Sequence, residues 1–183
     1  PCAAIYLVLH REAGVVTLTP LMKIVIAREL LTAGLEELDR THTVLSNGLD
    51  CGREQLLESV AGADAIVADP TVSVDEELLE AAGAQLKLVA NFAVGHDNVD
   101  LDACRARGVV VTNTPDVLTN ATAELAVGLT LAAARRITGS ERRMRNGEWR
   151  GWDPGDFLGF ELRGATIGVV GMGRIGRRYA ELM

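Results

Sequence analysis

The chain has 183 residues, of which 48% are apolar and 23% are charged, and its formal net charge is −7. This length allows one ordinary domain, or one domain and part of another, and the composition is too apolar for a disordered protein. The acidic balance argues against a nucleic-acid-binding surface, because such a surface needs clustered Lys and Arg to neutralise phosphates.

The cysteines and the hydropathy of the chain further narrow the class of protein to which it can belong. The three cysteines, Cys2, Cys51 and Cys104, are widely spaced and form no C-x-x-C pair, which predicts neither a disulfide framework nor a metal site. We therefore expect a reducing, cytoplasmic location. The most apolar stretch, 121–134, contains Glu124 and is shorter than the roughly 20 residues of a membrane-spanning helix. It is interpreted as a buried helix, with no membrane association expected.

The first 21 residues stand apart from the rest of the chain. They contain an apolar patch, but no basic segment precedes it and His10 and Arg11 interrupt it, so the pattern is not that of a signal peptide. Met22 is followed by a short β-branched run, as at a natural start. We expect residues 1–21 to be a leader or non-native extension. The alternative is an additional strand at 5–9.

From Met22 onward, short apolar runs alternate with helical patterns. The predicted strands are 23–27, 43–46, 65–68, 88–90 and 109–112, and the predicted helices between them are 30–38, 53–60, 75–82 and 101–107. Ser73 and Glu76 have capping-box spacing, Asp100 can cap the next helix, and Gly108 suits a left-handed stop. Strands separated by single helices predict an α/β domain with a five-stranded parallel sheet covered on both faces.

The chain changes character after residue 112. The segment "NTPDVLTN" is rich in turn formers and predicts a boundary or hinge. A long helix is predicted from Ala121 to about Ile137; since it is apolar all round, it should be buried on several sides. A charged helix is predicted at 139–146. The irregular arm after this helix carries Trp149, Trp152, Phe157 and Phe160, which should pack on the chain itself or on a subunit partner.

The stretch "ATIGVVGMGRIGRRYAEL" has the G-x-G-x-x-G spacing at Gly171, Gly173 and Gly176. An apolar segment predicted as a strand precedes it and a helix comes after it, which is the context of a dinucleotide-binding loop. In that role Gly171 permits the turn, Gly173 lets the backbone approach a pyrophosphate, and Gly176 allows close helix packing. The residue that selects NAD or NADP would come about 20 residues later, after Met183, so the two cofactors are not distinguished.

A second candidate site comes directly after the fourth predicted strand. A turn at Gly95 would expose the backbone N–H groups of Val94 and Gly95, which could bind a carboxylate. His96 has no partner carboxylate identifiable by spacing, so we interpret it as an ordinary histidine rather than a general base. Thr122 and Glu124 are expected in the first turn of the long helix, where capping and the helix dipole suit them.

Taken together, "VGHDNVDLDACRARGVVVTNTPDVLTNATAELAVGLTLAAARR" and "LRGATIGVVGMGRIGRR" resemble the D-isomer-specific 2-hydroxyacid dehydrogenases, and most of all their glyoxylate and hydroxypyruvate reductase branch. The resemblance implies a flavodoxin-like parallel-sheet substrate domain at 22–119. It further implies that 120–183 contain a dimerisation helix and arm and the beginning of a Rossmann NAD(P)-binding domain, and that the enzyme is a homodimer.

The resemblance also implies roles for individual residues. Val94 and Gly95 would bind the substrate carboxylate, and Thr122 would lie near the nicotinamide. The phosphate loop would comprise Gly171, Gly173, Arg174, Ile175 and Gly176. The implied reaction is hydride transfer from NADH or NADPH to the keto carbon of glyoxylate or hydroxypyruvate.

The family's catalytic arginine and its histidine–glutamate pair come well after the glycine loop, so no catalytic residue is expected within this chain. Our main hypothesis is a reductase of which this sequence is an incomplete part. The alternative is a non-catalytic protein that acts as a binding, dimerisation or cofactor-sensing subunit.

Overall fold

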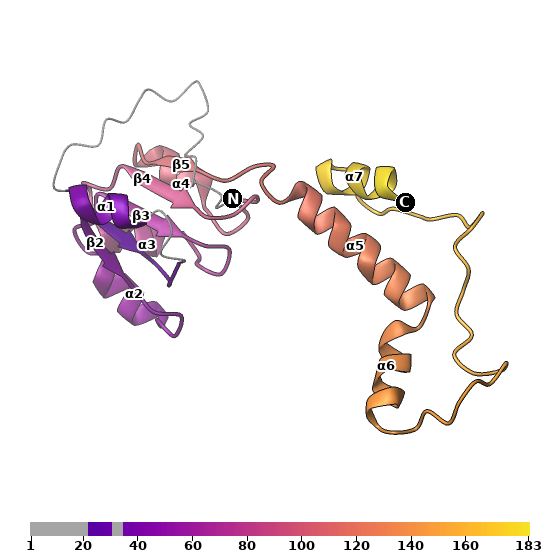
Figure 1. Ribbon diagram of the computed structural model, residues 1–183. Helices are drawn as coiled ribbons and strands as arrows, with labels where there is room; N and C mark the ends of the chain where they lie inside the picture. Colours follow the sequence, from indigo (N-terminus) through magenta and orange to yellow (C-terminus); the bar gives the residue numbers. More distant parts are fainter. Residues whose placement is uncertain (1–21, 31–34) are drawn as a thin grey trace. The chain divides into compact units, whose positions relative to one another are not determined.

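A computed structural model describes residues 22–30 and 35–183 of the chain. The predicted leader at 1–21, the alternative strand at 5–9, and part of the first predicted helix lie outside the described residues. The chain divides into two compact units between Pro115 and Asp116 (Figure 1). Each unit is described below by itself.

The first unit is built on a parallel sheet of five strands in the order β2-β1-β3-β4-β5. The strands are β1 (Lys23–Ile26), β2 (Thr43–Ser46), β3 (Ala65–Ala68), β4 (Leu88–Asn91) and β5 (Val110–Thr112). Register is set by pairs such as Ile24 with Val44 on one side and Ala65 on the other. The predicted strands and the predicted α/β class are confirmed, with ends that differ by at most one residue.

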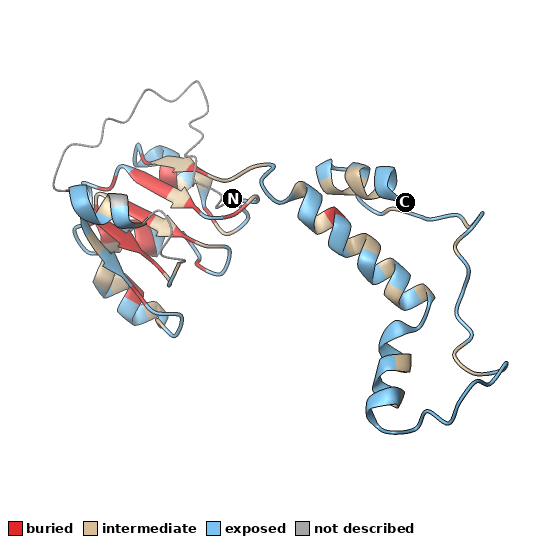
Figure 2. Ribbon diagram, in the orientation of Figure 1, coloured by how far each residue is buried: buried red, intermediate tan, exposed pale blue. Residues whose placement is uncertain are grey.

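Alternation along the strands divides the core into two layers. One face packs Val25, Ile66 and Val89 against residues of α2 (Arg53–Val60), α3 (Glu76–Ala82) and α4 (Leu101–Ala106). On the other face, Ile24, Ala65 and Leu88 pack with Leu38 of α1 (Leu35–Thr41). Buried residues therefore concentrate in the strands (Figure 2). The first helix differs from its predicted bounds, because Leu30 is not helical and the helix continues to Thr41.

Two of the three predicted helix signals are confirmed and one is wrong. The Asp100 carboxylate accepts a hydrogen bond from Ala103 N at 2.9 Å, and Gly108 adopts a left-handed φ of 69° after α4. Ser73 is not the cap of α3. Asp75 is, and its carboxylate accepts from Leu78 N at 3.0 Å. Asp75 lies two residues closer to α3 than Ser73 and accepts directly from the free N–H of Leu78. The Ser73 hydroxyl therefore only donates to the Asp75 carboxylate.

The second unit contains three helices: α5 (Thr119–Ala134), α6 (Ile137–Arg145) and α7 (Arg174–Leu182). The long helix begins two residues earlier than predicted, so Glu124 lies beyond its first turn. It ends before Ile137, because Arg136 adopts a left-handed φ of 55°. The prediction that this helix is buried is wrong for the single chain: only Ala123 is buried, and the exposed fractions of Leu125, Leu129 and Leu131 are 63%, 61% and 43%.

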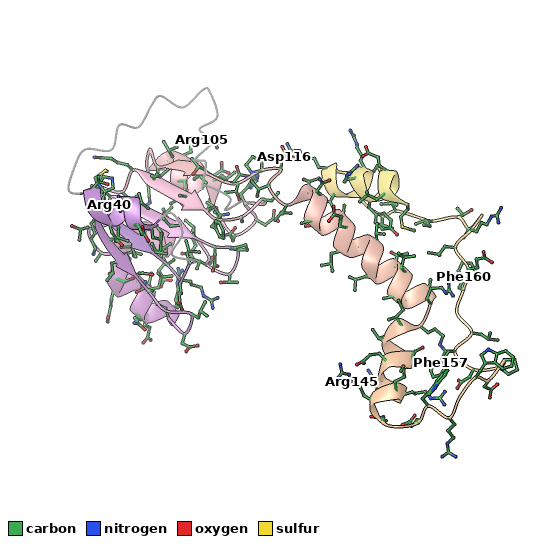
Figure 3. The ribbon with its side chains drawn as sticks, in the orientation of Figure 1. Arg40, Arg105, Asp116, Arg145, Phe157 and Phe160 are labelled. Atoms are coloured by element: carbon green, nitrogen blue, oxygen red, sulfur yellow. The ribbon has the colours of Figure 1, made fainter. Side chains whose placement is uncertain are left out.

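Residues 147–173 form an arm without helices or strands. The strand predicted before the glycine loop is not formed, since 165–170 pair with no strand in the described part of the chain and a strand requires such a neighbour. Figure 3 labels Phe157 and Phe160 on this arm. The Arg143 guanidinium of α6 lies over the Phe157 ring, 4.5 Å from its centroid, and the Trp149 and Phe157 ring centroids are 6.1 Å apart. The aromatic residues therefore pack partly on their own chain, whereas the exposed fraction of Trp152 is 84%.

Candidate functional site

The predicted carboxylate-binding residues lie in the loop after β4, at the carboxyl edge of the sheet. Asn91, the last residue of β4, is 2% exposed, and its Nδ2 donates to Gly95 O and Asn98 Oδ1, both at 3.0 Å. Asn98 Nδ2 returns a hydrogen bond to Asn91 Oδ1 at 3.1 Å. This reciprocal amide pair fixes both ends of the loop, because the buried Asn91 amide is satisfied by the half-buried Asn98 amide and by Gly95 O.

The carbonyl groups inside this loop are also occupied. Thr114 N donates to Ala93 O, and Asn113 Nδ2 donates to Val94 O, each at 2.8 Å. In contrast, the N–H groups of Val94 and Gly95 donate to no acceptor in 22–30 or 35–183. Val94 is half-buried and Gly95 is exposed. The structure thus leaves two adjacent amide donors available to an anion where the sequence predicted them.

His96 comes next in the chain and is exposed. Its carbonyl accepts from Val99 N at 2.9 Å, but its imidazole forms no hydrogen bond or ion pair with a carboxylate in the described part of the chain. A general base needs a group that orients it and sets its protonation state. The geometry therefore gives His96 no catalytic arrangement of its own.

A cleft at the carboxyl ends of β1 and β3 was not predicted from the sequence. Its volume is about 250 Å³. In the sheet, β2 lies on one side of β1 and β3 lies on the other, so the strand order reverses at β1. Open α/β sheets bind ligands at such a topological switch point. The lining residues are Ala27, Arg28, Cys51, Arg53, Leu56, Thr71, Val72, Ser73 and Asp75. An arginine directly after the first strand was the one signal available in the sequence.

Both arginines in this cleft bind neighbouring groups, but the Nε of Arg28 is buried without a hydrogen-bond partner among the described residues and lies 3.9 Å from Asp69 Oδ2. Arg28 donates to Thr71 Oγ1 at 2.6 Å and to Leu49 O at 2.8 Å, while Arg53 forms ion pairs with Asp75 and Glu77. Partial burial opposes ionisation of Asp75, yet the hydrogen bonds from Leu78 N–H and Arg53 hold its pKa below the usual range. Arg53 is therefore neutralised by close ion pairs, whereas the hydrogen bonds of Arg28 go to neutral oxygens and tie the strand-end loops together.

The predicted phosphate loop has the backbone that its glycines require. Gly171 adopts a φ of 94°, a conformation that other residues rarely adopt. A Cβ at Gly176 would fall on the Gly171 carbonyl, so only glycine lets α7 begin this close to the loop. Gly173 is the N-cap of α7, and a Cβ there would meet nothing within 4 Å. That space is open to a ligand at a helix N-terminus, where anions bind.

The remaining predicted cofactor residues surround this loop or lie on α5. Arg174 Nε is 3.2 Å from Asp116 Oδ1, and both side chains are 64% exposed. Ile175 and Thr122 are half-buried, Thr122 in the first turn of α5. The helix α7 is held on α5 by a hydrogen bond of 2.8 Å between the Tyr179 and Thr130 hydroxyls. The second unit thus contains all of the predicted cofactor-binding residues.

The described residues offer no cluster of metal ligands. No three His, Cys, Asp or Glu side chains gather as they would around a metal ion within 22–30 and 35–183. Over the same residues, no helix has the length and hydropathy needed to cross a membrane.

Comparison with known proteins identifies the family. The profile of the D-isomer specific 2-hydroxyacid dehydrogenase catalytic domain matches residues 24–165. The glyoxylate reductase of Pyrococcus furiosus is 44% identical over 165 residues, which cover 87% of this chain and 49% of that protein. The chain thus spans about half the length of the curated relatives that it matches.

Solved structures agree with the sequence matches. The TT0316 protein of Thermus thermophilus superposes with a TM-score of 0.80 at 38% identity. The superposition covers 88% of this chain and 52% of the TT0316 chain. An NADPH-dependent glyoxylate/hydroxypyruvate reductase from Sinorhizobium meliloti, in complex with NADP and malonate, superposes with a TM-score of 0.73 at 33% identity. This superposition covers 88% of this chain and 49% of the reductase chain. The predicted family is confirmed: the chain belongs to the D-isomer specific 2-hydroxyacid dehydrogenases, on their glyoxylate reductase branch.

Proposed function

We propose that this chain is part of an NAD(P)H-dependent reductase that converts a small 2-oxo acid, glyoxylate or hydroxypyruvate, to the D-2-hydroxy acid. The observation that carries the proposal is the glycine loop, in which Gly171 has a positive φ and Gly173 opens α7 with free space above it. No feature of the described residues favours the non-catalytic alternative over this function.

The cofactor would be held by Gly171, Gly173, Arg174, Ile175 and Gly176, with Thr122 towards its nicotinamide end. The amide groups at the start of α7 would face the pyrophosphate, and Arg174 would add a positive charge. When bound, a reduced nicotinamide supplies the hydride. Either NAD or NADP fits this loop, and the Sinorhizobium relative was crystallised with NADP.

The substrate carboxylate would be held by the Val94 and Gly95 amides. These donors have no competing acceptor among the described residues, and they belong to a loop fixed at both ends, so little reorganisation is needed when an anion binds. These hydrogen bonds to the carboxylate would also orient the keto carbon of the substrate. We propose that the polarising arginine and the histidine–glutamate pair that protonates the forming alkoxide lie outside these 183 residues.

We propose that residues 22–119 act as the substrate domain, and that 120–183 supply the dimerisation helix and arm with the first βα unit of the cofactor domain. The exposed leucines of α5, Leu125, Leu129 and Leu131, favour a homodimer in which a second copy covers this helix. The free thiols of Cys51 and Cys104 are consistent with a reducing compartment, and we propose the cytoplasm.

Turnover of the complete enzyme tests the proposed reaction. NADH or NADPH is mixed with glyoxylate or hydroxypyruvate, and cofactor oxidation is monitored by absorbance. Gly173→Leu should abolish cofactor binding, because its side chain would fill the open space at the N-terminus of α7. Gly139→Leu places the same side chain on α6, again with nothing within 4 Å, and should leave binding unchanged. Failure of the wild type to oxidise either cofactor would overturn the assignment.

The proposed dimer is tested separately by light scattering on the eluted protein. Leu129→Asp puts a charge on the exposed face of α5 and should shift the protein from dimer to monomer. A wild-type protein that is monomeric at all concentrations would contradict the role given to α5.

A further inference from the structure

The loop after β4 contains three successive peptide units whose carbonyl groups each accept a hydrogen bond. Ala93 O accepts from Thr114 N at 2.8 Å, Val94 O from Asn113 Nδ2 at 2.8 Å, and Gly95 O from Asn91 Nδ2 at 3.0 Å. Two of these three donors belong to the segment after β5, the strand paired with β4. Neighbouring strands thus supply the contacts that fix the loop.

Holding a carbonyl also fixes the direction of the next amide. The N–H and C=O of a trans peptide lie in one plane and point in opposite directions, and the chain has no cis peptide bond in its described residues. The hydrogen bond to Ala93 O therefore orients the N–H of Val94, that to Val94 O orients the N–H of Gly95, and that to Gly95 O orients the N–H of His96.

All three of these amides are unpaired among the described residues. Neither Val94 N, Gly95 N nor His96 N donates to any acceptor in 22–30 or 35–183. Glycine is not required here by conformation: Gly95 has no positive φ, and a Cβ on it would only meet Asp97 Oδ2 at 3.6 Å. The direction of these donors is therefore set by the hydrogen bonds to the carbonyls and not by a special glycine backbone.

We propose that Asn113 and Asn91 are positioning residues that hold the Val94–His96 segment as a preorganised, three-amide site for the carboxylate of the substrate. This rests on the proposed function and extends it in two ways: the His96 amide joins the site, and two buried or half-buried asparagines orient it. Preorganised donors bind an anion with little conformational cost, so loss of one orienting hydrogen bond weakens binding without unfolding the sheet.

Titration of the ¹⁵N-labelled 183-residue chain with sodium glycolate, at constant chloride, tests this by NMR. Glycolate is the product expected from glyoxylate and carries the same carboxylate. In the wild type, the Val94, Gly95 and His96 amides should shift in a saturable manner. Asn113→Leu, which keeps a similar shape without a donor, should weaken binding about five- to tenfold, the effect of one lost hydrogen bond.

Asn146→Leu is the matched control, because the Asn146 amide donates to Glu148 at the surface of the second unit. It should leave glycolate binding unchanged. The dispersion of the spectrum shows whether Asn113→Leu is folded, and Asn113→Ala replaces it if it is not. Equal affinity in the wild type and the Asn113 variant would overturn the positioning role alone. Absence of any shift at residues 94–96 in the wild type would overturn the proposed carboxylate site and this inference with it.

Discussion

The two units of this chain contrast in how they bury their apolar side chains. The first unit encloses a core in which Val25, Ile66, Leu78 and Val89 are inaccessible to solvent. In the second, only Ala123 of the apolar residues is buried, although α5 is more apolar than α2 of the first unit. Figure 2 shows the buried residues concentrated in the first unit. Hydropathy alone therefore does not decide burial. In the first unit, the strands and the helices that connect them pack on one another. The exposed apolar face of α5 is left without such a partner among the described residues.

The contrast predicts opposite responses to truncation of a leucine in each unit. Leu78→Ala removes a side chain packed between α3 and the sheet and should destabilise the first unit by about 3 kcal/mol. Leu129→Ala on α5 should change the stability of the monomer by no more than about 0.5 kcal/mol. Amide hydrogen exchange of β3 and β4, and of α5, measures each unit separately. A similar loss of stability in the Leu78→Ala and Leu129→Ala variants would show that α5 is buried in solution.

The arm offers a way to perturb the second unit alone. Phe160 N donates to Ala134 O at 2.6 Å, and a Cβ at the neighbouring Gly159 would lie 2.7 Å from that same oxygen. Gly159→Ala should therefore detach the arm from the end of α5 at a cost of about 2 kcal/mol. Faster proteolysis between residues 147 and 165 is the expected readout. Gly155→Ala, whose Cβ has no close backbone neighbour, is the control, and equal cleavage of both variants would contradict the contact.

How much the sequence predicts also differs between the two units. The strands of the first unit were located to within one residue, because each is a short apolar run bounded by turn formers. The burial of α5 was predicted wrongly, since an apolar helix indicates a covered surface but not which chain covers it. The strand predicted before the glycine loop is not formed for a similar reason: a strand requires a paired neighbour, and 165–170 pair with none among the described residues.

The candidate site shows the same limit at the level of single residues. Val94 and Gly95 are predicted as carboxylate-binding residues from the turn after β4, a local feature of the sequence, and this role stays a prediction. Asn113 is not predicted, because it contacts Val94 across 19 positions and nothing in its own surroundings indicates that contact. The Arg53–Asp75 pair was also missed, as it joins two helices through side chains alone. Contacts between distant residues are set by the topology of the sheet rather than by local pattern.

The N-cap of α3 gives the first unit a pH dependence. Asp75→Ala removes the cap and the Arg53 pair and should cost about 1 kcal/mol, with only a small part from the ion pair because the Asp75 side chain is 43% exposed. The folded-state pKa of Asp75 is lowered, so its ionised form stabilises the fold above the ordinary aspartate value of about 4. This contribution is lost as pH falls through the lower folded-state pKa.

Unfolding of the first unit, measured between pH 7 and pH 2 for the wild type and Asp75→Asn, tests this dependence. Asparagine can still cap the helix but cannot ionise. The wild type should be the more stable protein near pH 7, and the difference should shrink towards pH 2. A difference that stays constant over this range would show that the charge of Asp75 contributes nothing.

Arg174 tests whether an exposed ion pair in the second unit serves stability or binding. Its partner Asp116 is as exposed as Arg174 itself, and surface pairs of this kind contribute between zero and about 1 kcal/mol. Arg174→Ala should therefore change the melting of the second unit no more than Arg145→Ala, which removes a comparable surface pair with Glu141. In the complete enzyme, however, only Arg174→Ala should weaken NADH or NADPH binding, because only Arg174 borders the glycine loop. Equal binding by both variants would remove Arg174 from the phosphate loop, while a large loss of stability would assign it a structural role.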